Sequence, residues 1–309
     1  MSEVVRLSNS EIQTFKDCRR RWWFSYYRRL QPKYKDSTGA LALGTRIHAA
    51  LDDYYANGTN LLTAHNNLVN TEKAVLLEKF LDVSELEKEA ELGHIMLEGY
   101  LQWVEENGID AELEMISTEE IITAPLFNGE VELTGKLDMR VRRKGDGVRM
   151  FRDFKTVGGS LGDFANLAPM NEQILTYMLL EATKVDETER SDGGIFTMLK
   201  KVRRSAAARP PFYDQIEVRH NIFTLRSFWD RLHGTITDLM RVRTALDKGE
   251  SPAFHAYPSP SRDCKWKCKF YSVCTLVDDG SASEQAISEM YDVADPYAYY
   301  GINETKGNE

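Results

Sequence analysis

The fold of this 309-residue chain is decided by the stretch "VELTGKLDMRVRRKGDGVRMFRDFKT", residues 131–156. Apolar and polar residues alternate in its first half, which predicts a strand with one buried face, because successive side chains of a strand point to opposite faces. The run "KGDG" at 144–147 is a strong hairpin-turn signal. A turn centred in this run places Asp138 opposite Asp153. The sequence thus predicts an antiparallel hairpin in which two carboxylates face each other.

Lys155 lies two positions beyond Asp153 and therefore on the same face of the second strand. Carboxylates that face each other on a sheet repel. When two lie close together, one of them normally takes up a proton. A hard divalent cation such as Mg²⁺ between them would remove this conflict and could activate water or bind a phosphate. A turn register shifted by one or two residues would instead leave both acids as ordinary surface groups, so the hairpin alone leaves both interpretations open.

The net charge of −9 argues against nucleic-acid binding only until its distribution is examined. Residues 61–120 hold 15 Asp and Glu against 3 Lys. Three other stretches are basic, with 8 Lys and Arg in 16–35, 8 in 136–155 and 5 in 199–209. Each could be no more than a solvated charged surface, but together they keep nucleic acid open as a partner.

The rest of the chain shows helical and extended patterns. Helices are predicted from Ser8 or Ser10 to Tyr27, at 44–55, over most of 61–107, at 169–184 and at 222–248, and further strands at 115–123 and 194–199. No apolar run approaches the roughly 18 residues of a membrane-spanning helix, and the N-terminus has no signal-peptide pattern. We therefore expect a soluble, cytoplasmic protein without a membrane partner.

Four motifs occur in an informative order: "GTRIHAAL", "GKLDMRV", "RDFKT" and "NEQILTYMLL". In this order and spacing they resemble the RecB-type branch of the PD-(D/E)XK nuclease superfamily. The resemblance extends over about residues 7–275. It implies an α/β fold with a restriction-endonuclease-like core, in which a mixed central sheet is flanked by helices.

The resemblance also implies roles for single residues. Metal ligands for Mg²⁺ or Mn²⁺ would be His48, Asp138, Asp153 and the backbone carbonyl of Phe154. Lys155 would position the attacking water and act in catalysis with the two aspartates. Gln173 and Tyr177 would belong to a helix that contacts DNA.

The chain has four cysteines, Cys18 and the group Cys264, Cys268 and Cys274. A disulfide framework is implausible in a long chain without a signal peptide, which leaves free thiols or a metal site. The spacing fits poorly to zinc sites, which usually have two close pairs. It resembles the four-cysteine nucleases that hold a 4Fe-4S cluster. Arg19 stands where that family more often has Pro, and the first gap of the triplet is three residues rather than two, so zinc remains an alternative.

A cluster joining segments 8–30 and 255–277 would close a loop of about 245 residues and could stabilise the fold by about 4 to 5 kcal/mol in the chain-entropy model. We expect it to act as a staple between the two ends of the chain. The N-terminal helix would then present Arg20 and Arg21 to DNA. Its Trp and Tyr residues could stack on bases, although such aromatics are more often core residues.

These observations predict one nuclease domain over 1–277, with an acidic helical insert at 61–112 and an acidic, loosely ordered tail at 278–309. The predicted function is metal-dependent exonucleolytic hydrolysis of DNA in phage or prokaryotic recombination, repair or spacer processing. The alternative is a non-catalytic DNA-binding or assembly module that keeps the fold and partners an integrase, an annealing protein or another recombination protein. The complete His, Asp, Asp, Lys set favours the enzyme.

Overall fold

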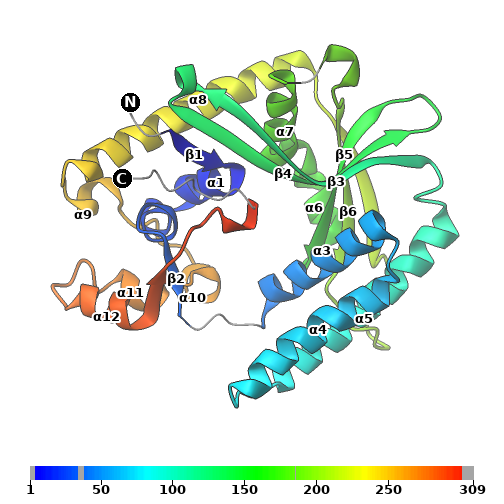
Figure 1. Cartoon of the computed structure of the whole chain (residues 1–309), viewed down its shortest axis with the longest axis horizontal. Coiled ribbons are helices and arrows are strands. Elements are labelled where there is room, and N and C mark those ends of the chain that lie inside the picture. Colours follow the sequence, from blue (N-terminus) through cyan, green and yellow to red (C-terminus); the bar gives the residue numbers. More distant parts are fainter. Residues whose placement is uncertain (1–3, 34–37, 185, 301–309) are drawn as a thin grey trace. The chain divides into compact units, whose positions relative to one another are not determined.

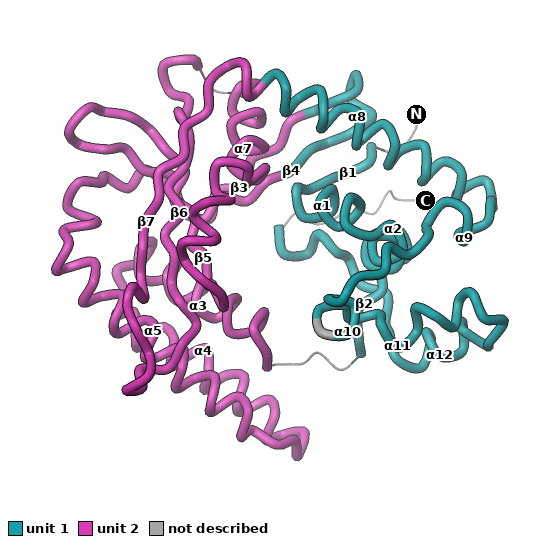
Figure 2. Tube along the Cα trace, turned by 180° about the vertical axis from the view of Figure 1, so that it is seen from behind, with its two compact units in different colours: residues 1–35, 125–134, 226–309 teal, residues 36–124, 135–225 magenta. Residues whose placement is uncertain are grey.

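The computed structural model describes residues 4–33, 38–184 and 186–300. The chain forms two compact units (Figure 2). Unit 1 comprises Met1–Lys35, Pro125–Thr134 and Arg226–Glu309, and unit 2 comprises Asp36–Ala124 and Gly135–Leu225. Each unit is described by itself below.

Unit 2 contains the sheet and the helices that cover it (Figure 1). Its strands are β3 (Leu113–Leu126, whose last two residues belong to unit 1), β4 (Val131–Arg143, whose first four residues belong to unit 1), β5 (Arg149–Val157), β6 (Gly193–Lys200) and β7 (Tyr213–Arg219). Its helices are α3 (Ala40–Asn57), α4 (Leu61–Glu78), α5 (Ser84–Asn107), α6 (Leu161–Leu167) and α7 (Glu172–Ala182), with short 3₁₀ turns at Ala168–Met170 and Glu187–Glu189. β4 pairs with β3 and β5, β5 pairs parallel with β6, and β6 pairs antiparallel with β7. The predicted α/β fold with a mixed sheet is confirmed.

The β4–β5 hairpin has the predicted register. Met139 pairs with Arg152 and Val141 with Met150 in an antiparallel ladder. The ladder ends one position before Asp138 and Asp153, where the N–H of Phe154 donates to Oδ2 of Asp138 at 2.9 Å. An aspartate side chain thus replaces the carbonyl that would continue the ladder, and both acids lie at the point where the two strands separate.

Helices flank the sheet on both faces. On one face α3, α4 and α5 share a core with the apolar side chains of β4, β5, β6 and β7, including Met139, Phe154 and Tyr213. On the other face α7 packs against β6. The two approach so closely that a Cβ at Gly194 would lie 2.4 Å from the Ile174 side chain. The acidic segment expected as an insert therefore supplies, through α4 and α5, one side of the sheet's own core.

Unit 1 begins with β1 (Val5–Ser8), which pairs parallel with the first residues of β4, and α1 (Asn9–Asp17). Ser8 is the N-cap and accepts from the N–H of Glu11, as predicted. The single helix expected to reach Tyr27 is wrong. Cys18 has extended dihedral angles (φ −161°, ψ 111°), and the chain restarts as α2 (Arg19–Trp22) and a π-helical turn (Trp23–Tyr27). Cys18 keeps the backbone bonds to Thr14 and from Trp22, both at 3.0 Å, but its extended angles end one helix and begin the next.

The remaining elements of unit 1 are mostly short. They are β2 (Leu30–Pro32), a 3₁₀ turn at Phe127–Gly129, α8 (Ile222–Asp247, whose first residues belong to unit 2), α9 (Pro252–His255), α10 (Cys264–Lys267), α11 (Tyr271–Cys274), α12 (Ser283–Met290), β8 (Tyr291–Val293) and a 3₁₀ turn at Ala298–Tyr300. None of the helices in the described ranges is long and apolar enough to cross a membrane.

The segment after 278 differs from the loosely ordered tail that the sequence suggested. Its strand β8 pairs antiparallel with β2. Tyr297 is buried, and its hydroxyl donates to the carbonyl of Arg6 at 3.0 Å and to Glu11. The tail therefore supplies apolar and polar contacts that its composition did not reveal, while residues 301–309 lie outside the described part.

Candidate active site

The end of the β4–β5 ladder carries the two predicted acids. Asp153 is buried, and Asp138 is largely buried. Nδ1 of His48, on α3, lies 3.3 Å from Oδ2 of Asp138. Three of the predicted ligands, from two strands and one helix, are therefore adjacent in unit 2.

Lys155 and Gln173 complete a connected network around Asp153. Nζ of Lys155 lies 2.6 Å from Oδ2 of Asp153 and donates to Oε1 of Gln173 at 2.8 Å. Gln173 in turn donates from Nε2 to Oδ1 of Asp153 and to the hydroxyl of Tyr177, both at 2.8 Å. The Tyr177 hydroxyl donates to the carbonyl of Lys136 at 2.7 Å. Gln173 and Tyr177, which were expected to contact DNA, thus also hold the lysine and the buried aspartate in place.

Gly135 explains how α7 comes so close to β4. A Cβ at this position would lie 2.9 Å from Tyr177 and from Leu180, a distance that real Cβ atoms essentially never show. The glycine of the "GKLD" motif therefore leaves the space that the Tyr177 ring occupies, three residues before Asp138.

Charges set the protonation of the site. Burial raises the pKa of Asp153 to about 6, against the opposing effect of Lys155, and the charge of Asp138 adds to the rise. Burial also acts to raise the pKa of Asp138, but His48, Lys155 and the Phe154 N–H outweigh it and the pKa is lowered. For His48 burial favours the neutral form, yet Asp138 prevails and the pKa is raised. Asp138 therefore keeps its charge well below neutral pH, whereas Asp153, with a pKa of about 6, is the first of the two to take up a proton as the pH falls.

α3 follows the sheet edge with one face. Gly44, four residues before His48, approaches β5 so closely that a Cβ there would lie 3.1 Å from Oγ1 of Thr156. Four residues after His48, Oδ1 of Asp52 is buried without a hydrogen-bond partner, and burial raises the pKa of Asp52. The sequence analysis missed Asp52, although the spacing of four residues from His48 is the signal that could have found it.

The donor atoms of the site are of the kinds that bind divalent cations. Asp138, Asp153 and His48 offer carboxylate oxygens and an imidazole, and Oδ2 of Asp153 is buried without a hydrogen bond although Lys155 lies beside it. Nowhere in the described residues is a group of three or more His, Cys, Asp or Glu arranged so that it could hold a metal ion. Holding one here would exchange the Lys155–Asp153 ion pair for a contact between Asp153 and the cation.

The comparison with known families agrees with this geometry. A sequence model of the PD-(D/E)XK nuclease superfamily matches residues 6–275. The chain belongs to this superfamily. The match includes all of the predicted site residues and the four cysteines.

Solved structures with a similar backbone include two examples. One is described as a "putative exonuclease" from Eubacterium rectale, with 15% identity, a TM-score of 0.48 and coverage of 87% of each chain. The other is the protein SSO0001, with 14% identity, a TM-score of 0.33 and coverage of 78% of this chain and 87% of the other. No curated protein matches the sequence. The family assignment rests on the match over residues 6–275.

Arg152 is a residue of this PD-(D/E)XK core that the sequence analysis did not single out. Its side chain is 1% exposed. It donates to Asp110 at 2.7 Å, to the Tyr100 hydroxyl at 3.0 Å and to Oγ1 of Thr197 at 3.0 Å. This buried arginine thereby ties β5 to β6 and to α5. No local sequence pattern indicates such contacts.

The four cysteines of the nuclease chain are all free thiols of intermediate exposure. Burial raises the pKa values of Cys268 and Cys274, and the nearby Cys18 adds to both shifts, as does Cys264 for Cys268. The N–H of Ser259 donates to Sγ of Cys18 at 3.4 Å, and that of Ser261 to Cys264 at 3.3 Å. Within unit 1 the fold thus brings thiols from both ends of the chain into electrostatic range.

The two arginines predicted to contact DNA, Arg20 and Arg21, differ in exposure. Arg20 is 1% exposed and donates to the carbonyl of Ala256 at 2.7 Å, to that of Cys274 at 3.3 Å and to Asp278. These partners place the Arg20 side chain inside the cysteine region, the part of unit 1 formed by segments 8–30 and 255–278, rather than at the surface. Arg21 is partly exposed and pairs with Asp17 at 2.8 Å.

The tryptophans of this segment are core residues. Trp22 and Trp23 are 0% and 7% exposed, so neither presents a face for stacking on bases.

Proposed function

We propose that this chain is a metal-dependent DNA exonuclease of the RecB-type branch, hydrolysing phosphodiester bonds. One observation carries the proposal. The Gln173 side chain joins Lys155 and Asp153 directly beside Asp138 and His48. A non-catalytic module would have no need to keep a lysine oriented by a glutamine next to a buried acid.

The protein's own groups can orient the reacting atoms. Gln173 holds the Lys155 ammonium, which can donate hydrogen bonds to a water molecule and to a phosphate oxygen. Hydrolysis forms a bond between the water oxygen and phosphorus and breaks the bond from phosphorus to the leaving sugar oxygen, which takes up a proton. The Tyr177–Lys136 hydrogen bond fixes the helix that carries Gln173.

A cation at this site would be held by His48, Asp138, Asp153 and the carbonyl of Phe154. Mg²⁺ or Mn²⁺ bound there would neutralise phosphate charge and lower the pKa of a bound water. The buried Oδ2 of Asp153, which already has the Lys155 ammonium 2.6 Å away, supports this assignment, because it is a carboxylate oxygen that needs a cation beside it.

We also propose a 4Fe-4S cluster on Cys18, Cys264, Cys268 and Cys274. Two observations support it. Neighbouring cysteines contribute to the raised pKa values of Cys268 and Cys274, and two backbone N–H groups donate to Sγ of Cys18 and of Cys264. Backbone hydrogen bonds to sulfur are among the factors that tune such clusters. Zinc on the same thiols is the competing occupant.

The biological setting proposed is phage or prokaryotic DNA recombination, repair or spacer processing, in the cytoplasm of a bacterial or phage-infected cell, where such DNA is found. A recombination, annealing or integrase protein would be the partner. We further propose that residues 1–277 act together as one nuclease, with Arg21 among the DNA contacts.

End-labelled linear single- and double-stranded DNA and closed circles, incubated with Mg²⁺ or Mn²⁺, test the proposal. We expect metal-dependent release of labelled nucleotides from linear strands and much slower attack on circles. Equal rates on circles and linear DNA would indicate an endonuclease. DNA binding without cleavage under any metal would favour the non-catalytic module.

A further inference from the structure

The N-terminal half of α3 contacts residues of β4 and β5 and the residue that follows β6. His48 contacts Asp138 of β4, and Gly44 approaches Thr156 of β5. Another four residues earlier, the carbonyl of Ala40 lies 3.4 Å from Nζ of Lys201, the first residue after β6. Contacts spaced by four residues lie on one helix face. Lys201 therefore lies on the same side of α3 as the candidate metal ligand His48.

The sheet register fixes the separation between Lys201 and the active-site lysine. The N–H of Lys201 donates to the carbonyl of Val157 at 2.8 Å. Val157 is two residues beyond Lys155 on β5, and a strand rises about 3.3 Å per residue. Val157 pairs with Lys200 and Lys155 with Met198, so the backbone of Lys201 is three residues, about 10 Å, further along the sheet than that of Lys155.

Among the residues that the structure describes, which exclude 34–37, no carboxylate lies beside the half-buried ammonium of Lys201. Among the ion pairs of the described residues none includes it, and its ammonium donates only to the Ala40 carbonyl at a long distance. Burial lowers the pKa of Lys201, and no carboxylate offsets this effect. A lysine kept partly desolvated in this way has a free energy to gain from binding an anion.

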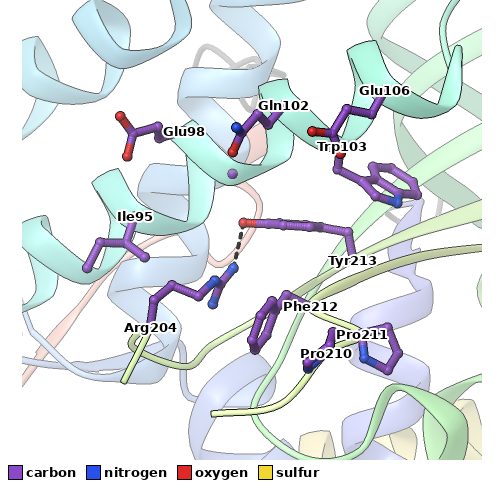
Figure 3. Close-up of a pocket in the computed structure, with 11 residues that line it drawn as sticks. Ile95, Glu98, Gln102, Trp103, Glu106, Arg204, Pro210, Pro211, Phe212 and Tyr213 are labelled. Atoms are coloured by element: carbon purple, nitrogen blue, oxygen red, sulfur yellow. Dashed lines mark hydrogen bonds between the residues drawn. The ribbon is translucent and has the colours of Figure 1, made fainter. Parts of the chain in front are cut away.

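The two arginines that follow are already paired. Arg203 pairs with Glu91 on α5. Arg204 donates to the Tyr213 hydroxyl at 2.7 Å and lies 3.8 Å from the centre of the Phe212 ring, in a pocket of about 620 Å³ (Figure 3). Carboxylates of Glu98 and Glu106 also line this pocket, which makes it a poor place for a phosphate.

We propose that Lys201 binds a phosphate of the DNA strand that neighbours the one at Lys155 and the paired aspartates. The inference rests on the proposed DNA substrate and adds a binding residue to that site. Charges of a DNA strand recur every few ångströms, so a strand whose scissile phosphate meets Lys155 presents another within reach of a lysine side chain about 10 Å along the sheet.

The test measures binding and cleavage separately. A short labelled single-stranded oligonucleotide is titrated against wild type, Lys201→Ala, Lys201→Arg and Lys184→Ala in EDTA at several salt concentrations. Lys184 is the control because it is an exposed lysine of unit 2, two residues beyond α7, whose ammonium donates to the uncharged Thr123 hydroxyl at 3.0 Å. Rates with Mg²⁺ are then measured at limiting and saturating DNA.

We expect Lys201→Ala to raise Kd about five- to tenfold at low salt and to reduce the salt slope by about 0.7, as one lost phosphate contact on a single strand does. The rate at saturating DNA should stay within about twofold of wild type, and Lys201→Arg should restore binding, since an arginine also binds phosphate. The melting temperature of Lys201→Ala should be unchanged or higher, because a partly desolvated charge is removed.

Lys201→Ala with the Kd and salt slope of Lys184→Ala would overturn the inference, as would a lower melting temperature with binding that arginine does not restore. Binding in EDTA needs no hydrolysis, so a protein that binds DNA through Lys201 but never cuts it refutes only the proposed activity. A Lys201→Ala protein that cuts DNA as fast as wild type at limiting DNA refutes only this inference. Wild type that binds no DNA refutes both.

Discussion

At the residue scale, the Lys155 ammonium acts as a positive charge beside the paired aspartates. The facing aspartates were expected to need a cation between them, and in the fold the Lys155 ammonium lies beside Asp153 while His48 lies beside Asp138. The protein thus offsets part of the repulsion itself, which lets the site persist without metal. A carboxylate close to a cation keeps its charge more easily than one facing another carboxylate alone.

The first prediction distinguishes the role of Lys155 in hydrolysis from the role of the aspartates in binding the metal ion. Lys155→Ala should cut DNA hydrolysis by about a hundred- to a thousandfold, because a donor aimed at the reacting atoms is lost. Metal-induced stabilisation should be retained, since the aspartates still bind the ion. Melting curves with and without Mn²⁺, beside a cleavage assay, provide the measurement.

Asp138→Asn is the matched variant. It should lose both cleavage and the metal-induced rise in melting temperature, because a ligand charge is removed. Near wild-type cleavage by Asp138→Asn would contradict the assignment of the whole site.

The second prediction concerns Gly135. Gly135→Ala places a Cβ against Tyr177 and Leu180, and we expect a loss of about 1 to 3 kcal/mol in the free energy of unfolding together with reduced cleavage. Denaturant unfolding measures the first effect. Gly234→Ala on α8 is the control, because nothing lies within 4 Å of a Cβ there and alanine favours a helix, so stability should be equal or greater.

At the scale of elements, the packing of α3, α4 and α5 contains a buried histidine. His65 on α4 is 0% exposed, both ring nitrogens lack hydrogen-bond partners, and a Cβ at Gly93 of α5 would lie 2.5 Å from its Nε2. Burial lowers the pKa of His65 to about 4, and the charges of Arg46 and His94 add to this. The packing of these helices therefore requires the neutral imidazole.

The third prediction follows from that pKa. Between about pH 6.5 and 4 the unfolded state binds a proton that the folded state refuses, so stability is fully present above the unfolded pKa and is lost as the pH falls through this window. We expect a loss of about 2 to 3 kcal/mol from this group. Unfolding of wild type and His65→Leu at pH 7 and at pH 4.5 measures it.

His65→Leu should be at least as stable as wild type at pH 7 and should lose less stability on acidification, because leucine has no nitrogens to leave unpaired. An equal loss in both proteins would show that other groups cause the acid sensitivity.

At the scale of the whole molecule, the cysteine region joins the first and last parts of the chain within unit 1. Arg20 ties the segment after Cys18 to the carbonyl of Cys274 and to Asp278, while Tyr297 reaches Glu11. These long-range contacts give the N-terminal helices partners that are more than 250 residues away in sequence.

The fourth prediction tests the cluster. Protein purified without oxygen should be brown and contain iron and sulfide in about equal amounts. Cys18→Ala should release them and lower stability by about 2 to 5 kcal/mol, since a cross-link over a long loop is lost. Metal analysis, absorbance spectra and melting curves are the measurements. Colourless protein with one zinc per chain, handled without oxygen, would replace iron by zinc in the assignment.

The sequence by itself determined the elements whose signals are local. The β4–β5 register followed from alternation and the "KGDG" turn, the cap at Ser8 followed from its hydroxyl, and the long helices followed from apolar periodicity. Such patterns are readable because each depends on residues only a few positions apart.

Only the tertiary structure decided which distant groups meet. It joined Gln173 to Lys155 and Asp153, buried Arg20 and Arg152, kinked the helix at Cys18 and packed Tyr297 onto Glu11. Each of these contacts depends on how well surfaces far apart in the chain fit together, and that fit overrides the local preference of a charged residue for solvent or of a helix to continue.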